Sequence, residues 1–495
     1  MTSGGVASIL RFDVPELSDW EAQVERSLRG GTPESLVGRS ADGIAIQPLY
    51  TAALHGTADD PAGLPGAAPF TRGPHGAPRR WELRQRHDLA DPAETSAAIR
   101  EDVAGGASGV WLRLRRPPAP GELLAALAGV NLEETPVLVD GGPWFAAAAE
   151  ATEALAAAVP PGGLVVGADP LGALAGHGFL LHEPAGELAR LASLLAVVHR
   201  RQHDRTGEGG PAVGGRAVTV DAAVYADAGA PPALELACML STGVAYLRAA
   251  EAGGIRPRAA APHIEARLAA TADQFATICK FRAARALWDC VLAACGVTTP
   301  ERRALRCGAV TSEAMFVAQD PFVNLVRATT AALAAAAGGA ECITVLPHDV
   351  VLGSPGEQGR RLARNISHLL ADETHLGAVV DPAGGSWYAE DRTTRLAEAA
   401  WERFGEIEAA GGMVAALLDG SLAATIAAAA ECRRERLAGG AEHVVGVTCF
   451  PPPAGDGDPR HEPGGPPPGT PQTPPEAAVA IPPLPLRRPS PGSAP

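Results

Sequence analysis

Runs of aliphatic and β-branched residues alternate with helical segments from about residue 80 to about residue 350, and this alternation constrains the fold most. We expect strands over 109–114, 135–140, 163–168, 217–224 and 342–346. We expect helices over 93–104, 122–128, 145–158, 187–202, 232–250, 263–294 and 323–337. Strands separated by helices in this way run parallel, because each helix returns the chain to the start of the next strand.

About four to six such units suit either an eight-stranded β/α barrel or a doubly wound parallel sheet. A nucleotide-binding sheet of the second kind has a Gly-x-Gly-x-x-Gly turn directly after a strand. None of the expected strands is followed by that turn. The sequence therefore favours an α/β chain built on an eight-stranded β/α (TIM) barrel.

The rest of the chain adds three parts to the barrel, which we place at residues 36–355. Residues 1–35 are expected to be an N-terminal arm, in which Asp19 caps a helix with Trp20 and Val24 on one face. Residues 356–450 are expected to be a helical extension of the barrel domain. Residues 451–495 contain 17 prolines in 45 residues, which predicts a disordered tail whose removal leaves stability unchanged.

Composition bounds the partners and the compartment. The net charge of −15 disfavours nucleic acid and anionic membranes as partners. The eight cysteines form no Cys-x-x-Cys pair, which favours free thiols in a reducing compartment over a disulfide scaffold. We see neither a signal-peptide pattern nor an uninterrupted apolar stretch of membrane-spanning length. We therefore expect a cytoplasmic protein.

Several short motifs resemble those of one known family. The loop over 381–390, with the sequence DPAGGSWYAE, resembles the DPxxGS-x-Y-x-E signature of the methylmalonyl-CoA mutase family. Further segments similar to that family follow in the same order along roughly 20–450: DGIAIQPLY at 42–50, PGAAPFTRG at 65–73, WELRQ at 81–85, AGA at 228–230, FRAARALW at 281–288, QDPFVN at 319–324 and ARN at 363–365. The resemblance implies a β/α barrel and radical rearrangement of acyl-CoA carbon skeletons with adenosylcobalamin.

Three features that the resemblance implies for a catalytic chain are absent at the matching positions. Arg86 stands where a tyrosine should face the corrin, and Val224 stands where a histidine should reach the thioester carbonyl. A valine side chain donates neither a proton nor a hydrogen bond. The cobalt-binding D-x-H-x-x-G is matched only by two segments of the wrong spacing, 372–377 and 458–464. We therefore assign no catalytic, cofactor-binding or metal-binding residue.

The pattern resembles the small, non-catalytic subunit of the heterodimeric bacterial enzymes in this family. That resemblance implies a catalytic large subunit as the partner. The partner would bind adenosylcobalamin and interconvert methylmalonyl-CoA and succinyl-CoA, so that this chain belongs to an isomerase but is inactive alone. Two alternatives are an autonomous acyl-CoA mutase barrel with a separately encoded cobalamin subunit, and a non-enzymatic scaffold. Arg86 and Val224 weigh against the first alternative.

Some residues have both a functional and a structural interpretation. Arg84 is a candidate for substrate binding through coenzyme A, and a structural salt bridge is the competing interpretation. His75 and His87 are expected to be exposed loop residues, and His348 is expected to cap a loop at the end of a barrel strand. Residues 481–489, IPPLPLRRP, resemble a PxxP ligand with flanking arginines, although codon-biased low complexity explains them equally well.

Overall fold

The computed structural model describes residues 15–52, 62–155, 163–206, 216–453 and 479–489. It divides into two compact units, Met1–Ala58 and Asp59–Pro495. The boundaries that we expected at residues 35, 355 and 450 stay predictions.

The first unit contains one helix and one small antiparallel pair. Helix α1 (Leu17–Ser27) begins two residues before Asp19, which instead accepts a hydrogen bond from the backbone N–H of Glu16 (3.0 Å) in a capping box. A 3-10 turn η1 (Pro33–Leu36) and the strands β1 (Gly38–Arg39) and β2 (Ala45–Ile46) follow. No residue of α1 is buried. The arm helix therefore keeps an apolar stripe that packing within this unit does not cover.

The second unit is built on an eight-stranded parallel sheet that closes into a barrel. Its strands are β3 (Glu82–Leu89), β4 (Gly109–Leu114), β5 (Val137–Asp140), β6 (Leu164–Val166), β8 (Val218–Asp221), β9 (Ile264–Ala270), β10 (Arg306–Thr311) and β11 (Cys342–Thr344). Their order is β6-β5-β4-β3-β11-β10-β9-β8. Ala168 closes the ring by bridging to Val218, with its N–H 3.1 Å from the carbonyl of Ala217. The predicted β/α barrel is confirmed.

Two expected elements have to be corrected. The strand expected over 217–224 ends at Asp221, and Ala223 and Val224 already belong to helix α8 (Ala223–Asp227). Residues 263–294 were expected to form a single helix, but Ile264–Ala270 form strand β9, and helix α11 (Gln274–Ala294) begins only after it. The sequence IEARLAA has good helix formers, yet all seven residues are buried between two layers of the barrel. Tertiary packing here overrides local propensity.

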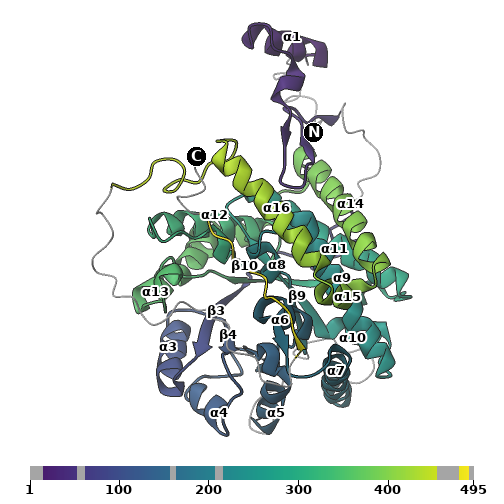
Figure 1. Ribbon diagram of the computed structural model, residues 1–495, viewed down its shortest axis with the longest axis vertical. Coiled ribbons are helices and arrows are strands. Elements are labelled where there is room, and N and C mark those ends of the chain that lie inside the picture. The colour runs from purple at the N-terminus through teal and green to yellow at the C-terminus, as the bar shows by residue number, and fades with distance from the viewer. Residues whose placement is uncertain (1–14, 53–61, 156–162, 207–215, 454–478, 490–495) are drawn as a thin grey trace, which may run out of the picture. The chain divides into compact units, whose positions relative to one another are not determined.

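Helices surround the barrel in the expected alternation (Figure 1). They are α3 (Pro92–Ala104), α4 (Glu122–Ala126), α5 (Phe145–Leu155), α6 (Pro170–His177), α7 (Pro184–Thr206), α8 (Ala223–Asp227), α9 (Pro232–Ala252), α10 (Pro257–Ala260), α11 and α12 (Val323–Ala337). Helix α9 is long and apolar enough to cross a membrane, but 83% of its apolar window is buried inside the protein, as in a core helix.

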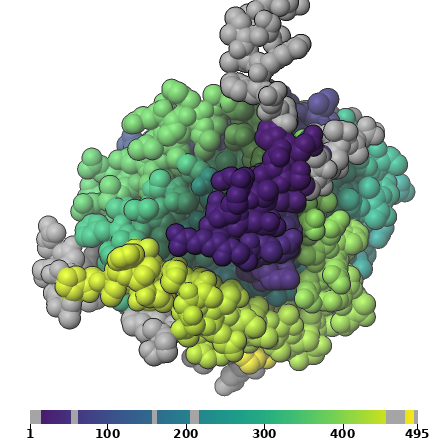
Figure 2. All heavy atoms as spheres, turned by 90° about the horizontal axis from the view of Figure 1, so that it is seen from above, coloured from purple at the N-terminus to yellow at the C-terminus, as the bar shows by residue number. Residues whose placement is uncertain are grey.

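Four more helices follow the last barrel strand: α13 (Glu357–His368), α14 (Trp387–Ala409), α15 (Gly412–Leu418) and α16 (Ser421–Ala438). Helix α14 packs against α9 and α11 of the barrel ring. The green and yellow-green atoms of these C-terminal helices cover much of the face drawn in Figure 2. The segment therefore extends the barrel's own helical layer.

Part of the proline-rich tail is folded onto the barrel, which differs from our expectation. Strand β12 (Val479–Ala480) pairs antiparallel with β7 (Phe179–Leu180), a short strand that lies outside the barrel sheet. Residues 481–489 continue from it across α6 and α8 (Figure 1). The expectation of disorder therefore fails for 479–489, while 454–478 and 490–495 lie outside the described residues.

Candidate functional site

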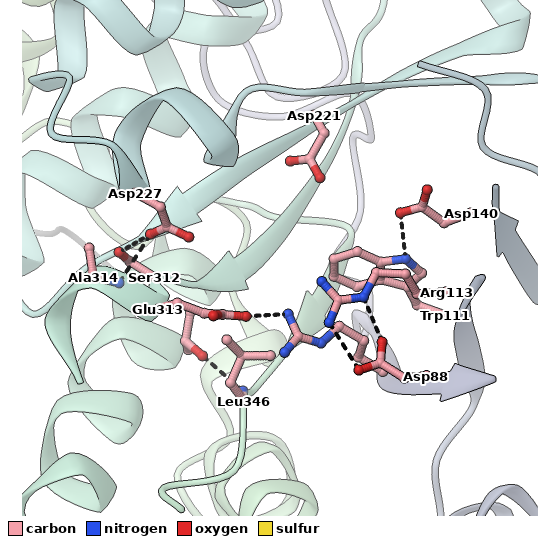
Figure 3. A network of polar contacts seen from close by, with 12 residues as sticks. Asp88, Trp111, Arg113, Asp140, Asp221, Asp227, Ser312, Glu313, Ala314 and Leu346 are labelled. Atoms are coloured by element: carbon pink, nitrogen blue, oxygen red, sulfur yellow. Dashed lines mark hydrogen bonds and ion pairs between the residues drawn. The ribbon is translucent and has the colours of Figure 1, made fainter. Parts of the chain in front are cut away.

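The candidate site lies at the C-terminal ends of the barrel strands, where loops of TIM barrels carry their functional side chains. Charged residues gather there from most of the strands (Figure 3). Asp88 comes from β3, Arg113 from β4, Asp140 from β5, Asp221 from β8 and Arg267 from β9. Because parallel strands all end at the same rim, residues far apart in sequence meet here. We call this end of the barrel the mouth.

Arg86 reaches across the mouth to the turn after β10. Its Nη1 donates to Oε1 of Glu313 at 2.7 Å, and the side chains are 9% and 13% exposed. Burial would raise the pKa of Glu313, but the charges of Arg86 and Arg113 hold that pKa below its usual value. The position where the family resemblance implies a tyrosine therefore holds one half of a largely buried ion pair.

Asp88 binds two further arginines of the mouth. Arg113 donates to both of its carboxylate oxygens (2.6 and 3.1 Å), and Arg115 donates to one of them (2.7 Å). Burial alone would raise the pKa of Asp88, but the arginines hold it well below its usual range. Arg113 and Arg115 therefore favour the ionised form of Asp88, whose charge in turn offsets theirs.

Trp111 forms the floor between the acidic and basic residues. Its Nε1 donates to Asp140 (2.9 Å), and the guanidinium of Arg267 lies 3.5 Å from the centre of its ring. Arg267 also donates to Asp221 (2.6 Å) and lies 3.6 Å from Asp140. An arginine stacked on an indole and bound by carboxylates is fixed in one orientation.

Two carboxyl groups near the mouth have strongly raised pKa values. Asp227, in the last turn of α8, accepts hydrogen bonds from Oγ of Ser312 (2.5 Å) and from the N–H of Ala314 (3.2 Å). Burial, helped by the charge of Glu313, raises its pKa to about 7. Burial likewise raises the pKa of Asp169 to about 7, although Tyr246 donates a short hydrogen bond to it. Each group is protonated in an appreciable fraction of molecules near neutral pH.

Val224 lies in the first turn of α8, three residues before Asp227, so it belongs to the same end of the barrel as Arg86. A Cβ added to Gly176 would lie 3.0 Å from Cγ2 of Val224, so the valine packs closely on α6. The structure thus brings both altered positions to the mouth, and neither supplies a group for proton transfer.

Arg84 lies at the opposite end of the barrel. It is the third residue of β3 and pairs in register with the first residue of β4. Its Nε donates to Glu82 (2.7 Å) and its Nη1 to Glu265 (3.3 Å), and the side chain is 4% exposed. The structural salt bridge is therefore present, whereas a contact with substrate stays a prediction.

The histidines have structural contacts. His75 was expected to be exposed, but it is partly buried and lies 2.9 Å from Glu341. The expectation for His87 was wrong, because its side chain is 5% exposed and lies 3.0 Å from Asp102. His348 follows β11 and stacks on Phe322 at the rim.

Of the two segments with near-miss cobalt-ligand spacing, the structure describes only 372–377, whose polar residues have structural contacts. Asp372 pairs with Arg80 (2.8 Å), and His375 begins the short turn η8 (Leu376–Ala378). Residues 458–464 lie outside the described residues. Within the part of the chain that the structure describes, no group of three or more metal-binding side chains is present.

The loop over 381–390 holds elements together and does not reach the mouth network. Arg282, fully buried on α11, forms short ion pairs with Asp381 and Glu390. Arg72 lies 3.6 Å from Glu390. Oγ of Ser386 caps α14. Three of the family-like segments thus meet in one structural clamp.

Comparison with known proteins agrees with these motifs. The family model for methylmalonyl-CoA mutase matches residues 39–121 and 212–460. The chain is 44% identical over 463 residues to the methylmalonyl-CoA mutase small subunit of Streptomyces virginiae, covering 90% of this chain and 72% of the relative. It is 35% identical over 464 residues to the small subunit of Propionibacterium freudenreichii subsp. shermanii, covering 89% and 70%. It is 29% identical over 467 residues to the methylmalonyl-CoA mutase of Cereibacter sphaeroides, covering 88% and 64%.

Proposed function

This chain belongs to the methylmalonyl-CoA mutase family, and we propose that it is the non-catalytic small subunit of a heterodimeric mutase. The observation that carries the proposal is the ion pair of Arg86 with Glu313 at the mouth of the barrel. Arg86 stands where the family resemblance implies a tyrosine facing the corrin, and Val224, in the first turn of α8, stands where it implies a histidine and supplies no hydrogen-bond donor. Relatives that are called small subunits match the chain over most of its length.

The charges of the mouth also argue against binding of an acyl-CoA. Coenzyme A carries several phosphate charges, and a site for them needs cationic groups that are not already neutralised. Arg86, Arg113 and Arg267 each contact a carboxylate within 2.7 Å. Phosphate groups that used these arginines would have to break their ion pairs, of which Arg86–Glu313 is largely buried, and would leave the carboxylates without their partners.

The residues at the mouth do not fit adenosylcobalamin either. The family is generally cobalamin-dependent, and the resemblance implies a tyrosine facing the corrin where this chain has Arg86. Here the guanidinium of Arg86 is held between Glu313 and the ring of Trp111, whose centre lies 5.5 Å away. We therefore assign the cofactor to the partner subunit.

In this proposal the partner is a catalytic large subunit, which interconverts methylmalonyl-CoA and succinyl-CoA, and this chain stabilises the complex. The arm supplies part of the contact, because Trp20 and Val24 lie on α1, a helix with no buried residue. A cytoplasmic location fits this role and stays a prediction. An autonomous mutase that borrows a separate cobalamin subunit is the alternative that the experiments must exclude.

The test is co-expression with a catalytic large subunit from a bacterium that also encodes a small subunit, followed by size-exclusion chromatography. We expect the two chains to elute together in equimolar amounts, as judged from stained gels after correction for chain mass. Separate elution at micromolar concentration would reject the subunit assignment. Co-expression with an isolated cobalamin-binding subunit is the matched control, and it should give no complex.

A further inference from the structure

Residues 479–489, which we call the strap, lie across the C-terminal side of the barrel along α6, β7 and α8 (Figure 1). We propose that the strap is a built-in peptide ligand that holds the mouth of the barrel closed. The proposal concerns the chain by itself and does not depend on the identity of a partner subunit.

The backbone contacts of the strap repeat every three residues. Three of its N–H groups donate to carbonyl oxygens of the barrel: Ile481 to Gly178 (2.8 Å), Leu484 to Ala175 (2.8 Å) and Arg487 to Asp227 (2.9 Å). A polyproline II helix has three residues per turn, so N–H groups at this spacing lie along one edge. The prolines at 482, 483 and 485 fall between them, where no donor is required. The positions of the prolines in the strap therefore agree with the positions of its hydrogen bonds to the barrel.

The groove is shaped for this segment. Gly178 has a φ of +79°, and a Cβ added to it would lie 2.6 Å from the carbonyl oxygen of Ile481 and 2.8 Å from Cδ of Pro483. Any side chain at this position would collide with the strap as well as straining the backbone. The β12–β7 pairing fixes the strap immediately before this point.

The far end of the strap is joined to the mouth. Nε of Arg488 donates to the carbonyl of Glu313 (3.3 Å), and its Nη2 lies 3.6 Å from the Glu313 carboxylate. The same glutamate holds Arg86. Asp227 accepts from Arg487 through its backbone and from Ser312 and Ala314 through its side chain. The docked strap thus ties α6, α8 and the turn after β10 to one another.

This arrangement gives the PxxP-like motif an intramolecular role. Such motifs bind grooves because their preformed helix loses little entropy on docking. Here the groove belongs to the same chain, so the effective concentration of the ligand is set by the length of the connection. The PxxP-like motif therefore binds a groove of its own barrel.

The test compares two proline substitutions. Leu484→Pro removes an N–H that donates to the barrel, whereas Leu486→Pro changes a residue that is 39% exposed. Both changes restrict the unfolded chain equally and both are compatible with polyproline II geometry. Trypsin reports the docked state, because it cuts the Arg487–Arg488 bond and spares the Arg488–Pro489 bond. Hydrogen exchange of peptides that span Asp227 and Ala314 reports the mouth.

We expect Leu484→Pro to accelerate cleavage after Arg487 by about fivefold, the effect of losing one typical hydrogen bond. Deuterium uptake at Asp227 and Ala314 should rise with it, and Leu486→Pro should change neither. Truncation after residue 453 should raise uptake at the mouth at least as much. The proposal is overturned if both substitutions act alike. It is also overturned if cleavage accelerates in Leu484→Pro, or the strap is removed, while uptake at the mouth stays at the wild-type level.

Discussion

Arg86 and Glu313 are 227 residues apart in sequence, and their side chains meet at 2.7 Å across the mouth of the barrel. Arg86→Ala should lower the free energy of unfolding by about 2–4 kcal/mol, because it leaves a largely buried carboxylate without its main partner. Chemical denaturation of the variant measures this loss.

Arg403→Ala is the control for that experiment. Arg403 pairs with Glu406 on α14, where both side chains are more than half exposed. Its removal should cost less than about 1 kcal/mol. The double variant Arg86→Ala/Glu313→Ala should be more stable than Arg86→Ala alone. If Arg86→Ala and Arg403→Ala lowered the free energy of unfolding equally, the Arg86–Glu313 pair would contribute no more to stability than an exposed ion pair.

Asp227 makes stability depend on pH in a defined direction. Its pKa is raised by burial from 3.8 to about 7 in the folded protein. Between about pH 4 and pH 7 the folded state therefore holds a proton that the unfolded state has released. The contribution of this group to the free energy of unfolding falls as pH rises through that window, and it is constant above it.

Asp227→Asn removes the titrating group and keeps an oxygen that accepts from Ser312 and Ala314. As pH rises from 4.5 to 7.5, the wild type should lose unfolding free energy relative to Asp227→Asn, because only the wild type carries the titrating carboxyl group. Urea titrations at several pH values measure it. Two parallel stability curves would show that Asp227 has an ordinary pKa.

Two helical glycines should respond to alanine in opposite ways. A Cβ on Gly243, in α9, would lie 2.5 Å from the ring of Trp288, a fully buried side chain. Gly243→Ala should therefore destabilise the protein by about 1–3 kcal/mol through overpacking. Gly405, in α14, has open space around it, so Gly405→Ala should stabilise by about 0.5–1 kcal/mol. Thermal melts that move in the same direction for both would argue against this packing of α9.

The barrel and the two altered positions were predictable, and the network at the mouth was not. Alternating strands and helices predict a parallel barrel, and Arg86 and Val224 are identified by their place within motifs. Glu313 and Asp227 carry no local signal, because they meet only when the sheet closes. Strands β3 and β10 were not among the expected strands either, and β9 was missed because IEARLAA favours a helix until both of its faces are buried.

The tail shows where composition misled the interpretation. Its proline content predicts that residues 451–495 gain nothing from packing, yet 479–489 dock on the barrel. The donors at Ile481, Leu484 and Arg487 were visible in the sequence as non-proline residues at a spacing of three. That spacing had no meaning until the acceptors on α6 and α8 were placed opposite them.

The arm should contribute to the heterodimer. Val24→Asp places a charge on the apolar stripe of α1 and should weaken binding of the large subunit by tenfold or more, as truncation of an interface anchor does. Gln23→Ala changes the residue directly before Val24 in the same helix. It is the control and should leave the affinity for the large subunit unchanged. Biolayer interferometry gives both values. Loss of the folded chain in Val24→Asp, seen by circular dichroism, would place the arm in the chain's own core instead.

The central claim is that this chain neither holds the cofactor nor performs the rearrangement. The direct measurement is a spectral titration of the purified chain with adenosylcobalamin, followed by a mutase assay with and without the large subunit. We predict no spectral shift up to about 100 μM, a concentration at which even a micromolar site would be nearly saturated. We also predict no turnover by the chain alone, including the Arg86→Tyr/Val224→His variant, and turnover only in the presence of the large subunit. Micromolar binding of adenosylcobalamin, or isomerisation of methylmalonyl-CoA by the lone wild-type chain, would contradict the claim.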